Sequence, residues 1–254
     1  MSASGAALAA EWIKTSTIRG PRWTVAALFV ATVGLGALIC WFTNRDFASA
    51  VSDGQVFDPV STGFGGLLLG QLAAVVLGVT MIGGEYASGM IRVSLAAVPV
   101  RGRLLLAKAA VLTAIVLAAG LVTAFVTFFL GQALLGSHGT TIGAPHVLRA
   151  VVGAGIYLTL IALFSLGVAT MLRSQTLALG ILVPFFFMVS SILEAIPGVR
   201  HVAQYLPDKA GQRILQIHAQ NHDSFGPWTG IAITVGWVAA SLLGAWLLLR
   251  RRDA

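Results

Sequence analysis

Few residues of the types that carry out catalysis or bind metals occur at useful spacings in this chain. His218 and His222 lie four residues apart, so both rings would face one way on a helix and could bind a metal ion with Asp223 nearby. The signal is weak, because no deeper ligand accompanies these loop residues. Ser88 precedes Gly89, but a nucleophilic serine needs a histidine within reach as its general base. We therefore expect neither a metal site nor a catalytic site.

A nucleotide-binding loop is also missing from the sequence. The only lysines are Lys14, Lys108 and Lys209, and none of them ends a Gly-x-x-x-x-Gly-Lys-Ser/Thr motif. If the protein depends on ATP, another polypeptide must hydrolyse it. The chain itself is predicted to be no enzyme and to hold no cofactor of its own.

The composition indicates an integral membrane protein. Of 254 residues, 57% are hydrophobic and only 10% are charged, and the mean hydropathy is +0.89. Soluble domains carry about 25% charged residues. This rules out a disordered chain and a nucleic-acid-binding globule despite the net charge of +7, because excess Lys and Arg in so apolar a chain belong at membrane faces.

Six continuous apolar runs are long enough to cross a bilayer core, which takes about 20 residues per helix. They are Trp23–Thr43, Gly63–Gly84, Leu104–Leu135, Val147–Met171, Leu177–Ile196 and Trp228–Leu249. Runs of this kind exclude a transmembrane β-barrel, whose strands alternate polar and apolar residues. The predicted fold is an all-α integral membrane protein with one membrane domain over residues 23–249.

The distribution of Lys and Arg predicts that both termini lie in the cytoplasm. In that orientation 11 of the 16 basic residues are cytoplasmic and 5 are external, as the positive-inside rule favours. The cytoplasmic set is Lys14, Arg19, Arg22, Arg92, Arg101, Arg103, Lys108, Arg173, Arg250, Arg251 and Arg252. All five histidines are then external and Ser88 is cytoplasmic, which argues against intramembrane proteolysis. We expect a multi-pass protein of the plasma membrane.

Ionisable residues are nearly absent from the predicted spans. Lys108, Arg149 and Glu194 each lie near a span end, where we expect Lys108 to extend its side chain to the interface. This argues against a proton-coupled carrier. Gln71 is the main midspan amide, and we expect a hydrogen bond between helices there, with the lining of a substrate path as the alternative. Pro184 should kink the fifth span or free a carbonyl.

Small residues recur four apart on three of the spans and predict close helix packing or dimerisation. They are Gly66 and Gly70, then Ala110, Ala114 and Ala118, and finally Gly236, Ala240 and Gly244.

The most structured polar signal is the cytoplasmic loop over residues 83–103. Glu85 comes where the second span leaves the membrane, and residues 90–98 can form a short amphipathic helix. Pro99 closes that helix, because the residue before a proline disfavours the helical conformation. Arg101 and Arg103 lead into the third span. On the residues alone, a charged loop that only anchors two helices is the alternative.

This loop resembles that of the permease subunits of ABC-2 type exporters. In that family an acidic residue at the end of span two precedes an aromatic residue, a small-Gly pair, a basic residue, a short helix and Pro-x-x-Arg. The matching residues are Glu85, Tyr86, Gly89, Arg92, Pro99 and, in shifted positions, Arg101 and Arg103, with Lys108 early in span three. Residues 205–211 are similar to a weaker external motif of actinobacterial members.

The resemblance implies a dimeric membrane core, formed with a second copy of this chain or with a paralogue. The core would contact membrane lipid, and no nucleic acid is expected as a partner. An ATPase subunit carrying ATP and Mg would dock on each half. Residues 90–98, including Leu95, would then be the coupling helix, residues 1–22 an interfacial helix, and residues 250–254 a basic tail. The implied function is the permease of an ATP-driven exporter; the alternative is a non-transporting scaffold or sensor subunit.

Within the proposed coupling loop, we expect the Glu85 carboxylate to pair with Arg92 or Arg103. Apolar side chains at Ile91, Val93 and Leu95 would fill a groove of the ATPase. Arg92 and Arg101 would pair with acidic residues at the rim of that groove.

Overall fold

The computed structural model describes residues 3–47, 57–97, 100–196, 198–217 and 224–251. In these ranges every regular element is a helix, so the predicted all-α fold is confirmed. Six of the helical segments are long and apolar enough to cross a membrane, which confirms the six predicted spans.

Each predicted span corresponds to one helical segment, with small shifts of its ends. Two of the six are built from consecutive pieces. The spans are α2 (Arg19–Arg45), α4 (Pro59–Gly63) continuing through a 3-10 turn (Phe64–Gly66) into α5 (Leu67–Ser88), α7 (Arg101–Leu135), α8 (Val147–Leu172), α9 (Gln175–Pro184) continuing through a π-helical segment (Phe185–Val189) into α10 (Ser190–Ala195), and α13 (Pro227–Arg251).

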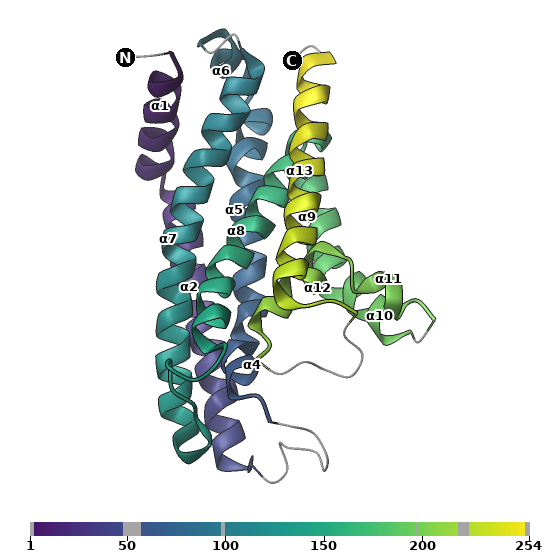
Figure 1. The fold of residues 1–254 in the computed structure, drawn as a ribbon. Helices are drawn as coiled ribbons and strands as arrows, with labels where there is room; N and C mark the ends of the chain where they lie inside the picture. The colour runs from purple at the N-terminus through teal and green to yellow at the C-terminus, as the bar shows by residue number, and fades with distance from the viewer. Residues whose placement is uncertain (1–2, 48–56, 98–99, 197, 218–223, 252–254) are drawn as a thin grey trace.

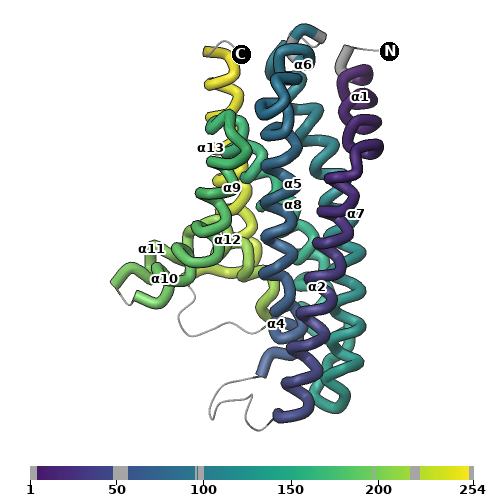
Figure 2. Tube along the Cα trace, turned by 180° about the vertical axis from the view of Figure 1, so that it is seen from behind, coloured from purple at the N-terminus to yellow at the C-terminus, as the bar shows by residue number. Residues whose placement is uncertain are grey.

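Both chain termini lie at one end of the helical bundle, called here the terminal end, together with the short helix α6 (Ile91–Ala97) (Figures 1 and 2). An even number of spans requires this arrangement. The sequence predicts that this end faces the cytoplasm, and that orientation stays a prediction.

Helix α8 is the centre of the bundle and packs against α5, α7 and α13. In its most apolar stretch 72% of the residues are buried inside the chain, against 22% for α2 and for the α9–α10 segment. Side chains such as Tyr157, Leu158 and Ile161 of α8 are fully enclosed. The apolar residues on α2 and α9 that remain exposed are available to lipid or to another subunit.

Small residues allow α5 to lie very close to its neighbours. A Cβ atom added at Gly70 would fall 2.3 Å from Oγ1 of Thr32 on α2, and one at Gly78 would fall 2.1 Å from the carbonyl oxygen of Ala162 on α8. Any larger residue would push these helices apart. The prediction that the Gly66–Gly70 face packs closely is confirmed within the chain, since Gly66 also abuts α2.

The fifth span changes its helix type at the proline, where the sequence predicted a kink or a free carbonyl. Pro184 has no N–H to donate, and the chain widens into the π-helical segment directly after it. The Ser190 hydroxyl oxygen, at the end of this segment, lies 3.1 Å from the carbonyl oxygen of Phe185. Beyond α10 the short helices α11 (Arg200–Ala203) and α12 (Pro207–Gln212) turn back, and α12 packs against α13 (Figure 1).

Helix α1 (Ala3–Thr17) precedes the first span and lies beside the first part of α7 in both views (Figures 1 and 2). Ile18 has extended backbone angles and separates α1 from α2. The first span therefore begins at Arg19, a few residues before the predicted Trp23. The short helix in the loop is α6, close to the predicted 90–98, while Pro99 lies outside the described residues.

Candidate functional site

Four charged side chains meet at the terminal end, and we call Glu11, Lys14, Glu85 and Lys108 the charge cluster. The Lys108 ammonium donates to Oε2 of Glu11 at 2.9 Å and to Oε1 of Glu85 at 2.6 Å. Lys14 also donates to Oε1 of Glu85. The Lys108 side chain is 0% exposed. The cluster therefore joins α1, α5 and α7 through buried ion pairs.

Burial explains why the cluster has four members. An isolated ammonium removed from water is costly, and pairing with carboxylates offsets that cost only when the geometry is good. Two lysines and two glutamates leave no net charge. The second oxygen of Glu85, Oε2, is buried and has no hydrogen-bond partner among the described residues.

Two predictions about this region are wrong. Lys108 does not extend to the interface, because α1 lies beside the start of α7 and brings Glu11 to it. The Glu85 partners are Lys108 and Lys14 rather than Arg92 or Arg103, both of which are exposed. The sequence held one signal of the Glu11–Lys108 pair: Glu11 is an isolated acid in α1, and Lys108 is an isolated base in an apolar stretch of α7.

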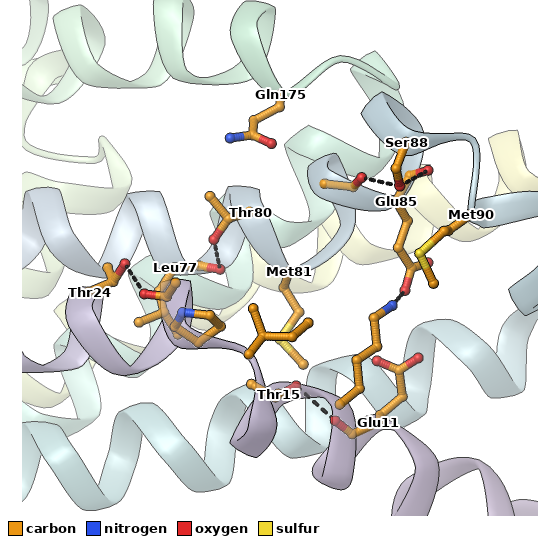
Figure 3. A pocket seen from close by; sticks show the side chains of 15 residues that line it. Glu11, Thr15, Thr24, Leu77, Thr80, Met81, Glu85, Ser88, Met90 and Gln175 are labelled. Carbon is orange, nitrogen blue, oxygen red and sulfur yellow. Dashed lines mark hydrogen bonds and ion pairs between the residues drawn. The ribbon is translucent and has the colours of Figure 1, made fainter.

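A cavity of about 380 Å³ adjoins the charge cluster. Its walls come from α1, the start of α2, α5 and the first residue of α9, Gln175. Figure 3 shows Glu11 and Glu85 toward one end of this cavity and Leu77 and Thr24 toward the other. The cavity therefore has a charged end and a more apolar end.

Gly89 makes the sharp turn between α5 and α6. Its φ of 72° is in the left-handed region, which L-residues with a side chain adopt at a cost. Its N–H donates to the carbonyl of Tyr86 and closes the last turn of α5. Tyr86 is half-buried, and the guanidinium of Arg173, from the turn after α8, lies 6.0 Å from its ring. Tyr86 and Gly89 of the sequence motif therefore fix the turn between α5 and α6, called here the α5–α6 corner.

The residues around α6 divide into an inner and an outer set. Ile91 is buried, so the prediction that it fills a groove of a partner is wrong. Arg92, Val93 and the preceding Met90 are exposed. The side chain of Leu95 lies outside the described part of the chain.

The two arginines after α6 differ in their surroundings. Arg101 donates to the carbonyl of Leu249, near the end of α13, so at least part of its guanidinium is used within the subunit. Arg103 is exposed. The coupling roles assigned to both from sequence stay predictions.

A second polar group lies deeper in the bundle. Oε1 of Gln71 accepts hydrogen bonds from the Tyr157 hydroxyl at 2.6 Å and from Nε2 of Gln212 at 3.2 Å. The expected helix-to-helix hydrogen bond of Gln71 is thus confirmed, and its place on a substrate path stays a prediction. Tyr157 and Gln212 also line a cavity of about 250 Å³. Sequence reasoning missed both, because neither has a spacing that points to Gln71.

The segment between α10 and α13 holds one strongly buried carboxyl group. Oδ1 of Asp208 accepts from the Ser190 hydroxyl at 3.0 Å. Burial raises the pKa of Asp208 to about 6, against the opposing effects of the Lys209 charge and of the Ser190 hydrogen bond. Lys209 itself pairs with Glu194 at 2.8 Å.

No group of three His, Cys, Asp or Glu side chains that could hold a metal ion occurs in the part of the chain that was described. His218, His222 and Asp223 lie outside it.

Comparison with known families agrees with the motif at the α5–α6 corner. The profile of a family described as "ABC-2 family transporter protein" matches residues 7–191, from α1 into α10. This is well over half of the chain. No curated protein matches the sequence. The match, with the six spanning helices, places the chain in the ABC-2 transporter family as a multi-pass membrane permease.

Proposed function

We propose that this chain is the membrane-spanning subunit of an ATP-driven exporter and that α6 couples it to a separate ATPase subunit. ATP and Mg would be bound by that partner, since this sequence has no phosphate-binding loop. Two permease chains, identical or paralogous, would form the substrate path between them.

The observation that carries this proposal is the link between the two helices that flank α6. Glu85 lies in the last turn of α5, and Lys108 lies two turns into α7. Their buried ion pair holds the end of α5 against the start of α7. A force applied to α6 would therefore move both spans together instead of bending the loop.

The outer side of α6 has the composition expected of a docking surface. Val93 of α6 is 67% exposed next to the cationic Arg92, while Met90, just before the helix, is 48% exposed and also lines the cavity beside Glu85. Outside the bilayer, apolar side chains at such exposure favour contact with another protein. An acidic rim on the ATPase would complement Arg92.

The test is co-purification of the ATPase with tagged variants of this chain. The cognate ATPase is first identified as the ATP-hydrolysing protein retained by the wild-type chain in membranes of its own source. Val93→Asp and Arg92→Glu should each reduce the retained ATPase about tenfold or more, as expected when an interface loses an apolar anchor or gains a repelling charge. Arg251→Glu is the matched control, because Arg251 is exposed at the same end of the bundle, on α13.

Equal recovery of the ATPase with the α6 variants and the control would refute docking through α6. If docking holds, ATP-driven movement of a fluorescent phospholipid or a lipophilic dye across proteoliposomes tests export. ATP hydrolysis that responds to these compounds without moving them would favour the sensor alternative.

A further inference from the structure

The cavity beside the charge cluster has features of a ligand site that the coupling proposal does not use. Its volume of about 380 Å³ is many times the roughly 30 Å³ that one water molecule occupies. Its charged end contains Glu85, whose residue is 3% exposed and whose Oε2 atom is buried without a partner. A buried carboxylate oxygen normally accepts at least one hydrogen bond, so this atom indicates a missing donor.

The position of the cavity indicates that the donor comes from a lipid. The cavity lies where α2 enters the membrane, between that helix and α5. Trp12 and Trp23 are exposed on α1 and at the start of α2, and exposed Trp residues mark the headgroup level of a bilayer. Arg19 and Arg22 are exposed in the same stretch. The charged end of the cavity is therefore at the depth of phospholipid headgroups.

The direction of the cavity matches the direction of a lipid. Along α5, the lining residues run from Leu77 and Met81 toward Glu85 and Ser88, from the membrane interior toward the terminal end. A molecule with its polar group at Glu85 would place its apolar part beside Leu77 and Met81. This is the orientation of a phospholipid in the leaflet at the terminal end.

The charges inside the cavity select the headgroup. Lys14 is partly exposed at 28% and its ammonium can meet a phosphate, while Oε2 of Glu85 needs a donor. A headgroup that carries both a phosphate and an ammonium N–H complements this pair of charges. Figure 3 shows Met90 beside the Glu85 carboxylate, and this flexible half-exposed side chain can give way to the headgroup.

We propose that this cavity binds an aminophospholipid from the adjoining leaflet, with its ammonium donating to Oε2 of Glu85 and its phosphate beside Lys14. Such a lipid would fill the space between α1 and the bundle and complete the hydrogen bonding of the charge cluster. The proposal does not depend on α6 docking to an ATPase.

The experiment compares phosphatidylethanolamine with phosphatidylcholine of the same acyl chains. The two lipids differ only in the methyl groups that remove every N–H donor from choline. The purified full-length chain is exchanged into detergent with each lipid, and retained lipid is counted by native mass spectrometry. Phosphatidylethanolamine should be retained about tenfold more strongly, as expected for one charge-assisted hydrogen bond.

Two variants separate this site from general lipid contact. A Cβ atom added at Gly84 meets nothing within 4 Å, so Gly84→Leu extends into the cavity without a clash at its root. Gly34→Leu is the matched control, because Gly34 is in α2, has the same free space and does not line the cavity. Gly84→Leu should abolish the preference for phosphatidylethanolamine, and Gly34→Leu should keep it.

Glu85→Gln gives a second readout, because it removes the carboxylate and should also remove the headgroup preference. That change also leaves Lys108 short of a partner. If the Glu85 variant fails to fold for this reason, the Gly84→Leu result alone decides the test. Equal retention of the two lipids by the wild-type chain, or an unchanged preference in Gly84→Leu, would overturn the proposal. Retention of phosphatidylglycerol at the level of phosphatidylethanolamine would overturn the assignment of an ammonium.

Discussion

The Nζ atom of Lys108 lies 2.6 Å from Oε1 of Glu85, and both side chains are buried inside the helical bundle. The contact joins the end of one span to the beginning of the next across 23 residues of sequence, including the whole of α6. Because Glu11 also reaches Lys108, the N-terminal helix belongs to the same unit. This arrangement makes the corner at α6 one rigid piece with α1.

Removing Lys108 should destabilise the protein strongly. Lys108→Met removes the ion-pair partner of the buried Glu11 and leaves Glu85 with Lys14 alone, and breaking a buried pair costs about 3–5 kcal/mol. For a chain of this size the apparent Tm should fall by about 10 °C. The measurement is thermal unfolding in detergent, followed by tryptophan fluorescence.

Lys209→Met is the control for the loss of Lys108, since the Lys209–Glu194 pair is partly exposed and such pairs contribute about 1 kcal/mol or less. The double variant Lys108→Met/Glu85→Gln should lower the Tm by less than the sum of the shifts of the two single variants. Equal Tm shifts for Lys108→Met and Lys209→Met would show that the charge cluster contributes no special stability.

The two glycines near the end of α5 should respond to alanine in opposite directions. Gly89→Ala places a side chain at φ 72° and should cost about 1–2 kcal/mol, although nothing lies within 4 Å of the new atom. Gly84→Ala, in the helix interior with equal free space, should stabilise by about 0.5–1 kcal/mol. Thermal unfolding of both variants checks the signs, and a stabilising Gly89→Ala would contradict the left-handed corner.

Much of the fold could be predicted because the bilayer leaves the backbone few choices. Every N–H and C=O in hydrocarbon needs an internal partner, so six apolar runs of sufficient length imply six helices. Local sequence signals were also informative. The residues after Gly89 predicted a short helix, and α6 is that helix; Pro184 predicted a kink or a free carbonyl at the place where the structure has a π-helical segment.

The contacts between distant helices could not be predicted, because the spacing of residues within one helix says nothing about its rotation against another. Glu11 and Lys108 are 97 residues apart, and their pairing depends on how α1 lies beside the start of α7. The bond from Tyr157 to Gln71 likewise depends on how α8 and α5 are rotated. From its place in a loop, Arg101 was predicted to pair with acidic residues of a partner subunit. That its guanidinium donates to the carbonyl of Leu249 follows only from the position of the end of α13 beside it.

Acidification should stabilise the segment around Asp208. Its pKa of about 6 in the fold is above the value of about 3.9 for an unfolded chain, so the folded state binds the proton more tightly between these values. The stability contributed by this group is therefore full below about pH 4 and is lost as the pH rises through 6. From pH 7.5 to pH 5 the gain should be on the order of 1 kcal/mol.

Asp208→Asn tests this sign, because an amide resembles the protonated acid and does not titrate. The variant should lose the rise in Tm between pH 7.5 and pH 5, while Glu194→Gln, which alters a partly exposed carboxylate nearby, should retain it. Lys209 and the Ser190 hydroxyl are the groups that bear on Asp208, and both are unchanged in these variants. A wild-type Tm that falls over the same interval, with Asp208→Asn unchanged, would contradict the raised pKa.

The orientation of the bundle can be tested with cysteines, since the chain has one cysteine and it is buried. Cys40 is 0% exposed, so the wild-type chain should not react with a membrane-impermeant maleimide in cells or in lysates. Ser88→Cys places an exposed thiol at the terminal end, and Arg200→Cys places one in the exposed segment after α10. With the terminal end in the cytoplasm, as the charge distribution predicts, Arg200→Cys should be labelled in intact cells and Ser88→Cys only after lysis. Labelling of Ser88→Cys in intact cells would reverse the orientation and remove α6 from reach of any cytoplasmic ATPase.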